Sequence, residues 1–328
     1  MKNMIETFSA LGARLLGFGD DDATRAVIDS ACRATGSFTP ADVRRAVGAI
    51  ACDMLQREKL EAWLADYPAL PVAEPRRVLV VMAGNIPLVG FFDLLCVLVS
   101  GHGCLVKPSA KDSVLMEHVV GLLREIDPSA PVRLYDGTSP VDAVIATGSD
   151  NANRYFRAHY AGIPSLLRGS RQSVAVLSGR ETPEQLAGLA DDIWAYSGLG
   201  CRSVSLIFAP EGYEPALQIP PVNDKYINNY RQQRALLEMQ GRPFVDLGCA
   251  VAVEQCAFPA ALSRIANAHY ATLDEVVAWL AGHDGELQCV VTGCLPHSRR
   301  AGFGCAQSPA LTDYPDDRDV LAWLAALD

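Results

Sequence analysis

The chain has 328 residues, of which 50% are hydrophobic and 20% are charged, a composition typical of a folded globular protein. This length favours two closely connected domains over a single core. The formal net charge of −10 argues against a nucleic-acid partner, because binding a phosphate backbone requires clustered Lys and Arg side chains, and the sequence has no such cluster.

The ten cysteines raise the question of disulfides or a metal site. The N-terminal stretch MKNMIETFSALGARLL has an early Glu and no cleavage site, so we expect no secretory signal. No CxxC pair occurs, which argues against zinc, and we expect no bound metal. Reduced thiols in the cytoplasm fit these observations best.

Residues 1–72 are expected to form a helical segment. Apolar residues recur at near-helical spacing over residues 41–63, with charged residues between them. Three prolines between residues 68 and 75 then mark a connector.

Over residues 73–172 the pattern changes to alternating strand and helix, which predicts a mainly parallel sheet covered by helices on both faces. Residues 86–106 are apolar enough to resemble a membrane span, but they contain Asp93 and His102, and a buried helix followed by a buried strand explains them better. The expected elements are strand 78–82, helix 87–99, strand 104–106, helix 113–126 and strands 132–135 and 143–146.

A second alternating unit is expected over residues 173–295, beginning with a strand at 173–177. Thr182, Pro183 and Gln185 have the pattern of a helix start, with an N-cap, a proline in the first turn and a capping box. That helix is expected to end near Tyr196. After it we expect a strand at 204–208, irregular structure at 212–270, a helix at 274–281 and a strand at 287–292.

Cys201 lies in the glycine-rich turn SGLGCRS, between a predicted helix and a predicted strand. Glycines leave room for a substrate to approach the thiol closely. The thiolate is the nucleophilic form, and the neighbouring Arg202 favours it. The alternative is that Cys201 is one buried cysteine among ten, and taken alone this interpretation is the commoner one.

Ligands of parallel α/β sheets bind at the carboxyl ends of the strands. Asn85, in the turn AGN, is placed there to donate to an oxyanion, or simply to cap a helix. Lys107 in the next turn can reach a ribose or a phosphate, or it can be a solvated lysine. Gly148 and Ser149 begin a helix whose first N–H groups suit a pyrophosphate, or Ser149 is only an N-cap.

Other motifs are missing or weaker. No GxGxxG follows any strand, and HExxH and GxSxG do not occur, so the usual dinucleotide fingerprint, a zinc protease and a serine hydrolase have no support. The segment KYINNY at residues 225–230 is interpreted as a loop rich in polar and aromatic residues that forms a pocket wall.

The order and spacing of AGNIPLVGFF, CLVKPS, IATGSD and SGLGCRSVS resemble the aldehyde dehydrogenase superfamily. More closely, RQSVAVLSGRET, GLGCRSVSLIFAPEGY, DKYINNY and AQSPALTDYPDDRDVLAWL are similar to the LuxC-like acyl-CoA reductases, also called fatty acid reductases. The resemblance covers roughly residues 77–328. It implies a cofactor-binding α/β domain, a second α/β domain that carries Cys201, and a C-terminal segment, residues 296–328, that returns to the first domain.

The resemblance implies that Cys201 is the nucleophile and that Asn85 and the backbone N–H of Cys201 form an oxyanion hole. The implied reaction is attack on an acyl-CoA or acyl-carrier thioester, followed by hydride transfer from NADPH or NADH to give an aldehyde. Oxidising aldehyde dehydrogenases have a water-activating glutamate where this sequence has Leu167, which favours release by hydride or by a thiol over release as an acid.

For the cofactor, the family's KPSE pattern is KPSA here, with Ala110 at the acidic position and Lys111 after it. A ribose 2′-phosphate is therefore accommodated more easily, and NADPH is favoured over NADH. The resemblance implies four residues that line the cofactor site, namely Lys107, Ser109, Gly148 and Ser149.

Two alternatives stay open. One is a CoA-independent aldehyde dehydrogenase, which Leu167 disfavours. The other is a non-catalytic subunit that presents an acyl chain within a multi-enzyme complex, which the presence of both Cys201 and Asn85 disfavours. The sequence also leaves open whether the protein is a homo-oligomer or forms a complex with an acyl-activating enzyme.

Overall fold

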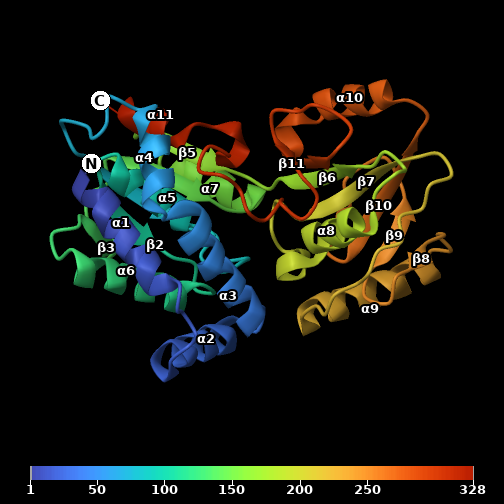
Figure 1. Ribbon diagram of the computed structural model, residues 1–328, viewed down its shortest axis with the longest axis horizontal. Coiled ribbons are helices and arrows are strands. Elements are labelled where there is room, and N and C mark those ends of the chain that lie inside the picture. Colours follow the sequence, from blue (N-terminus) through green and yellow to red (C-terminus); the bar gives the residue numbers. More distant parts are fainter. Residues whose placement is uncertain (1, 328) are drawn as a thin grey trace. The chain divides into compact units, whose positions relative to one another are not determined.

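The computed structural model describes residues 2–327, which fold into two compact units (Figure 1). Unit 1 consists of Met1–Ser170 and Ala310–Asp328, and unit 2 consists of Arg171–Pro309. Each unit has its own mainly parallel sheet and its own core, so the predicted α/β class is confirmed. The chain returns to unit 1 at residue 310, later than the expected position at residue 296.

The sheet of unit 1 is parallel throughout and has the strand order β3-β2-β1-β4-β5. Its central strands are buried because helices cover both faces, as the apolar runs in the sequence predict. The four-residue edge strand β5 was not predicted. The strands are β1 (Arg77–Val81), β2 (Gly103–Lys107), β3 (Val132–Leu134), β4 (Ala143–Thr147) and β5 (Ser165–Arg168).

The N-terminal helices pack into the same core as this sheet, on the face opposite to α7. The helix expected over residues 41–63 is interrupted, because a π-helical turn ends at Met54 and a new helix begins at Arg57. The helices of unit 1 are α1 (Lys2–Leu15), α2 (Asp22–Thr35), α3 (Pro40–Ala49), η1 (Ile50–Met54), α4 (Arg57–Ala65), α5 (Phe91–Val99), α6 (Ser113–Ile126), α7 (Asp150–His159) and α11 (Val320–Ala325).

The C-terminal helix α11 is tied into unit 1 by His102, a fully buried side chain immediately before β2. Its Nδ1 accepts a hydrogen bond of 3.0 Å from the Arg76 N–H, so Nε2 carries the proton and donates to the Leu324 carbonyl, also at 3.0 Å. Burial lowers the pKa of His102, which keeps the ring neutral. Residues from both ends of the chain therefore complete one core, as the colours of Figure 1 show.

The sheet of unit 2 has the order β12-β11-β6-β7-β10-β9-β8, and only β8 is antiparallel to its neighbour. The expectation that residues 212–270 are irregular is wrong, because they contain α9 and three strands. The elements are β6 (Gln172–Val176), α8 (Pro183–Trp194), η2 (Ala195–Gly198), β7 (Val204–Pro210), α9 (Asp224–Met239), β8 (Val245–Asp246), β9 (Val251–Glu254), β10 (Arg264–Tyr270), α10 (Leu273–Gly282), η3 (Asp284–Glu286), β11 (Leu287–Thr292) and β12 (Arg300–Ala301).

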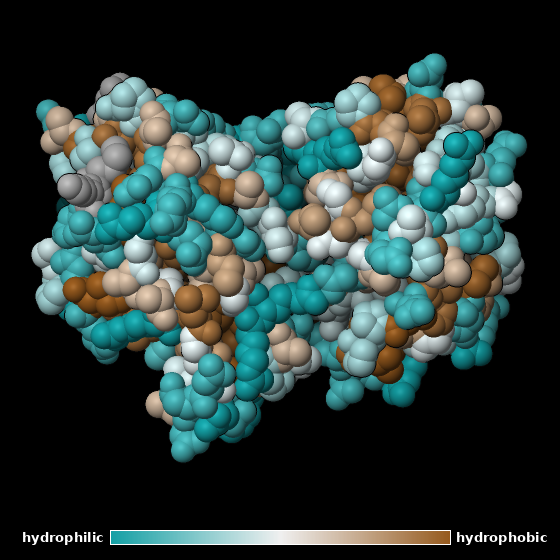
Figure 2. All heavy atoms as spheres, viewed as in Figure 1, coloured by the Kyte–Doolittle hydropathy of each residue, from teal (hydrophilic) through white to brown (hydrophobic). Residues whose placement is uncertain are grey.

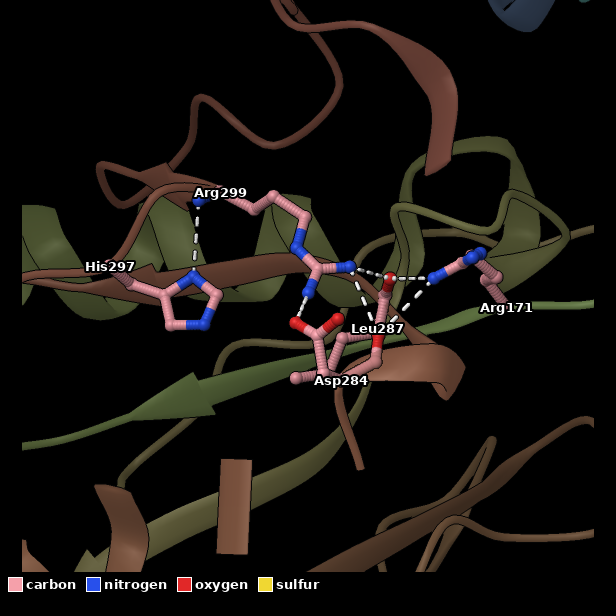
Figure 3. Close-up of polar contacts among 5 residues, drawn as sticks. All are labelled: Arg171, Asp284, Leu287, His297 and Arg299. Atoms are coloured by element: carbon pink, nitrogen blue, oxygen red, sulfur yellow. Dashed lines mark hydrogen bonds and ion pairs between the residues drawn. The ribbon is translucent and has the colours of Figure 1, made fainter. Parts of the chain in front are cut away.

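Two arginines fix the beginning of β11 beside β6 (Figure 3). Nη1 of Arg171 donates to the carbonyl oxygens of Asp284 and Leu287 at 3.3 and 3.0 Å. Nη1 of Arg299 donates to the same two oxygens at 3.1 and 2.7 Å, and its Nη2 forms an ion pair with the Asp284 carboxylate. The His297 ring accepts a hydrogen bond from the Arg299 backbone N–H at 3.1 Å. These contacts attach Arg171, the first residue of unit 2, to the beginning of β11.

Among the residues that the structure describes, no helix combines the length and apolarity required to cross a membrane. The apolar stretch at residues 86–106 is divided between the nine-residue helix α5 and the strand β2. On the face drawn in Figure 2, hydrophobic side chains occur in separate groups between hydrophilic ones.

Candidate active site

The predicted site residues are divided between the two units. In unit 1 they lie on three turns that follow β1, β2 and β4, which are neighbours in the parallel sheet. Because the carboxyl ends of parallel strands meet at one edge, the fold brings the Asn85, Lys107 and Gly148 turns to the same edge of unit 1. Cys201 lies in unit 2.

The Asn85 turn is in direct contact with the Lys107–Asp112 turn. The Met82 N–H donates to the Lys107 carbonyl at 3.0 Å, which continues the pairing of β1 with β2. Gly84 follows at a point where a Cβ atom would lie 2.5 Å from both Cβ and Oγ of Ser109, so only glycine fits there. Asn85 is the next residue, and its side chain is partly buried.

Farther along the same turn, Leu88 has a φ of +55°, a left-handed conformation that is unfavourable for a leucine. Its backbone N–H donates to Oδ2 of Asp112 at 2.9 Å. Asp112 is 2% exposed, and burial raises its pKa to about 8. The helix expected at residue 87 begins instead at Phe91, because residues 87–90 form this turn.

Sequence reasoning missed Asp112. The available signal was an aspartate just before an amphipathic helix, which suggests an N-cap. In the structure its side chain makes no capping hydrogen bond to α6 and contacts Leu88 instead.

The third turn joins β4 to α7. Ser149 is the N-cap, and its Oγ accepts a hydrogen bond of 3.4 Å from the Ala152 N–H. Gly148 donates its N–H to the Arg168 carbonyl at 3.2 Å. Ser149 is exposed, and Lys107 is exposed at the end of β2. The capping role of Ser149 is therefore compatible with a ligand at the helix N-terminus.

Leu167 and Arg168, the last two residues of β5, point to opposite faces of the sheet. Leu167 packs with the apolar cluster on the α7 side, which contains Leu79 and Val144. Arg168 is buried on the other side, where Nη1 donates to both carboxylate oxygens of Asp93 at 2.8 and 2.7 Å. This buried ion pair ties α5 to the edge strand. It was not predicted, although an aspartate in so apolar a helix was a signal for it.

In unit 2, the chain leading to Cys201 is strained. Tyr196, Ser197 and Gly198 have φ values of +53°, +51° and +64°. Two of the three are not glycine, and such a residue in the left-handed region costs roughly 1–2 kcal/mol. Strain of this kind persists only where the surroundings hold it.

The first turn of α9 supplies that support. Oγ of Ser197 accepts a hydrogen bond of 2.9 Å from the Asn223 N–H, and a Cβ on Gly198 would lie 3.2 Å from the Tyr226 ring. Tyr226 is 3% exposed, and its hydroxyl accepts a hydrogen bond of 3.1 Å from Trp194. The interpretation of residues 225–230 as a loop is wrong, because they lie in α9 and pack against the turn before Cys201.

Cys201 itself is exposed. Its carbonyl accepts a hydrogen bond of 2.9 Å from Oγ of Ser173, which fixes the end of the turn to β6. Nε of Arg202 donates to the Ala306 carbonyl at 2.5 Å. The structure therefore presents an accessible thiol on a backbone that is held from several sides.

A short segment near the end of unit 2 completes this support. The fully buried Asp192 on α8 accepts hydrogen bonds from the N–H groups of Gly304 and Ala306, at 2.7 and 2.9 Å. Burial raises the pKa of Asp192 to about 6, against the two hydrogen bonds that lower it. Nε2 of Gln307 then donates to Oγ of Ser203 at 3.3 Å. Sequence analysis assigned no role to Asp192 or Gln307.

The comparisons with known proteins agree with this fold. The family model described as acyl-CoA reductase (LuxC) matches residues 47–218, more than half of the chain, and the chain belongs to this family. A long-chain acyl-protein thioester reductase of Vibrio harveyi is 28% identical over an alignment of 174 residues, and the match covers 47% of this chain and 36% of that protein. The match thus spans little more than a third of the relative.

The fold is that of the aldehyde dehydrogenases. A crystal structure of a putative aldehyde dehydrogenase from Burkholderia cenocepacia superposes with a TM-score of 0.63 and 16% identity, over 85% of this chain and 72% of that one. The aldehyde dehydrogenase of Mycobacterium tuberculosis, solved with NAD+, gives a TM-score of 0.59 and 15% identity, over 84% and 70% of the two chains. The predicted fold is thereby confirmed.

Proposed function

We propose that this protein is a fatty acyl thioester reductase that forms an acyl-enzyme on Cys201 and releases an aldehyde. The observation that carries the proposal is the exposed Cys201 on a strained, supported turn in a chain that belongs to the acyl-CoA reductase family. A nucleophile must be accessible and must keep its geometry through the reaction, and this turn meets both needs.

In the first step the Cys201 thiolate attacks the carbonyl carbon of the acyl thioester. The side-chain amide of Asn85 and the backbone N–H of Cys201 stabilise the oxyanion that develops. The carbonyl re-forms, the bond to the donor thiol breaks, and this thiol leaves with a proton. Reduction of the acyl-enzyme then gives a thiohemiacetal on Cys201. It collapses to the aldehyde and regenerates the cysteine.

The first unit fits a nicotinamide dinucleotide, which when bound supplies the hydride for the second step. Gly84 permits the turns after β1 and β2 to approach closely, and α7 begins at the same sheet edge, where its first N–H groups suit a pyrophosphate. Lys107, Ser109, Gly148 and Ser149 would hold the dinucleotide. The exposed Ala110 and Lys111 favour NADPH over NADH, because the side chain at position 110 is not a carboxylate that would oppose a 2′-phosphate.

The donor thiol belongs to coenzyme A or to an acyl-carrying protein. The family description names acyl-CoA, whereas the name of the Vibrio harveyi relative specifies an acyl-protein thioester. Both donors leave as thiols, so the chemistry at Cys201 is the same for the two. The reduced cofactor and the acyl thioester are cytoplasmic metabolites, and we propose that the enzyme works there.

One assay tests this function. Purified protein is mixed with a long-chain acyl-CoA and NADPH, and the nicotinamide absorbance and the release of free thiol are followed together. We expect one thiol released for each NADPH oxidised, and neither signal with Cys201→Ala. Cys256→Ala, which removes another exposed thiol of unit 2, is the matched control and should keep the wild-type rate. Reduction by Cys201→Ala at the wild-type rate would exclude the proposed mechanism.

A further inference from the structure

We propose that Asp112 is a positioning residue that holds Asn85 in place for the acylation step. The inference rests on the proposed function, because it concerns the oxyanion donor of that reaction. Asp112 belongs to the turn after β2, and Asn85 belongs to the turn after β1. The two turns lie side by side because β1 and β2 are paired in register.

Asn85 lies between two attachments to the β2 turn. On its N-terminal side, the Met82 N–H bonds to the Lys107 carbonyl, and Gly84 is packed against Ser109. On its C-terminal side, the Leu88 N–H bonds to Oδ2 of Asp112. The first attachment is backbone pairing and glycine packing, which a side-chain substitution at Asp112 leaves intact. The second depends on the Asp112 carboxyl group.

The second attachment holds a conformation that the chain would not adopt by itself. Leu88 has a φ of +55°, which is unfavourable for any residue with a Cβ atom and especially for a bulky one. Without its hydrogen-bond acceptor, the buried Leu88 N–H would also lack a partner for its proton. Both effects favour rotation of the turn away from its present conformation, and Asn85 is three residues away from the rotated bond.

Among the described residues, the Asp112 side chain makes no second hydrogen bond that would explain its burial. Asp112 precedes α6 but makes no side-chain cap to it, and its second oxygen, Oδ1, is buried without a hydrogen-bond partner among the described residues. A buried carboxyl group with one hydrogen bond is unfavourable for stability. Its presence is explained if holding the Asn85 turn matters for the reaction.

The test separates acylation from the reactivity of the thiol. Single-turnover acylation of Cys201 by acyl-CoA needs an oxyanion donor, whereas alkylation of Cys201 by iodoacetamide does not. We expect Asp112→Ala to slow acylation by up to about 100-fold, the scale of a misplacement by 1 Å, and to leave the alkylation rate unchanged. Asp112→Asn keeps an acceptor for the Leu88 N–H in a neutral side chain of the same shape, and it should acylate within a few-fold of the wild-type rate.

The matched control is Asp142→Ala, at the opposite end of the same sheet. Asp142 accepts hydrogen bonds from the Arg77 side chain and backbone, so its loss should lower stability without slowing acylation. If Asp112→Ala melts below the assay temperature, Asp112→Ser replaces it, because a serine hydroxyl reaches less far than the carboxyl group.

A double variant decides whether Asp112 acts through Asn85. If it does, Asn85→Ala with Asp112→Ala should acylate no more slowly than Asn85→Ala alone, since the donor that Asp112 holds is already gone. Multiplied losses in the double variant, or wild-type acylation by Asp112→Ala, would overturn the inference and leave the proposed function standing. Failure of the wild-type protein itself to be acylated would overturn the proposed function, and this inference with it.

Discussion

Oγ of Ser197 accepts a hydrogen bond of 2.9 Å from the backbone N–H of Asn223, and the first turn of α9 thereby supports the left-handed residues before Cys201. Ser197 is 4% exposed and Asn223 is 8% exposed, so this hydrogen bond is shielded from water. The position of Cys201 thus depends on a segment of the chain that follows it by about twenty residues.

Ser197→Ala should destabilise unit 2 and slow acylation. It removes the acceptor of a buried N–H, which costs about 1–3 kcal/mol, and it leaves the strained φ unsupported. Thermal melting measures the first effect and single-turnover acylation the second. Ser205→Ala, which removes a hydroxyl that bonds to Gln172 on β6, is a control of the same chemical change away from the turn. Equal acylation rates for the two variants would show that the Ser197 hydroxyl does not position Cys201.

Asn85→Ala should lower kcat by a factor on the order of 10²–10³, the usual loss for one oxyanion donor. The melting temperature should stay near that of the wild type, because Asn85 is only partly buried at the sheet edge. A sharp fall in melting temperature with full activity per folded molecule would instead identify Asn85 as a structural turn residue.

Lys111→Ala should reduce the preference for NADPH. We expect the wild-type KM to be lower for NADPH than for NADH, because Lys111 can pair with a 2′-phosphate and Ala110 leaves room for it. The difference between the two KM values should shrink in the variant, and kcat should change little. Arg124→Ala, which removes a cation from the last turn of α6, is a suitable control. Equal KM values in the wild type would show that this turn does not recognise the 2′ position.

The surroundings of Leu167 lead to a prediction about the lifetime of the acyl-enzyme. Hydrolysis of an acyl-cysteine needs a base close to the attacking water, and Leu167 packs in an apolar cluster and provides none. Given acyl-CoA without reduced cofactor, Cys201 should therefore keep its acyl group well beyond one catalytic cycle, as intact-mass spectrometry can show. NADPH or excess coenzyme A should remove it. Rapid, steady production of free fatty acid would favour an oxidising aldehyde dehydrogenase.

Asp112 should make stability fall as pH rises. Burial raises its pKa from 3.8 to about 8, so between these values the folded protein keeps a proton that the unfolded chain has released. The stabilisation by this group is therefore complete below about pH 4 and is lost as pH rises towards about 8. Asp112→Asn lacks this effect, and its melting temperature relative to the wild type should increase over that interval. Asp142, whose pKa is lowered to about 2, should give the opposite dependence at acidic pH.

The sequence predicted the elements whose pattern of apolar and polar residues is clear. The apolar β-branched run of β1 and the amphipathic α6 could be located to within a residue or two. Because Asn85 follows one predicted parallel strand and Lys107 follows the next, the sequence also placed these two residues at one sheet edge. The helix α9 was not predicted, because only one of its buried residues is aliphatic; these residues are Tyr226, Tyr230, Gln233 and Leu237. Hydrophobic periodicity has little to detect on such a face.

The residues that hold the candidate site in place were not predicted, for a different reason. Asp112 and Asp192 accept hydrogen bonds from backbone N–H groups that lie 24 and 114 positions away, and the backbone N–H of Asn223 donates to the Ser197 hydroxyl, 26 positions away. Every residue type except proline has a backbone N–H, so the residue type of the partner does not reveal the hydrogen bond. Candidate reactive residues can be identified from their local motifs, but the groups that hold them require the fold.

The packing of α11 in unit 1 has a consequence for synthesis on the ribosome. Leu321 and Leu324 are fully buried in the same core as α1 and α5, and the Leu324 carbonyl is the partner of His102. Unit 2, by contrast, is one continuous stretch that emerges before these residues do. Domains that are contiguous in the chain can fold as they emerge. We therefore expect the nascent chain to carry a folded unit 2, with Cys201, before α11 completes the core of unit 1.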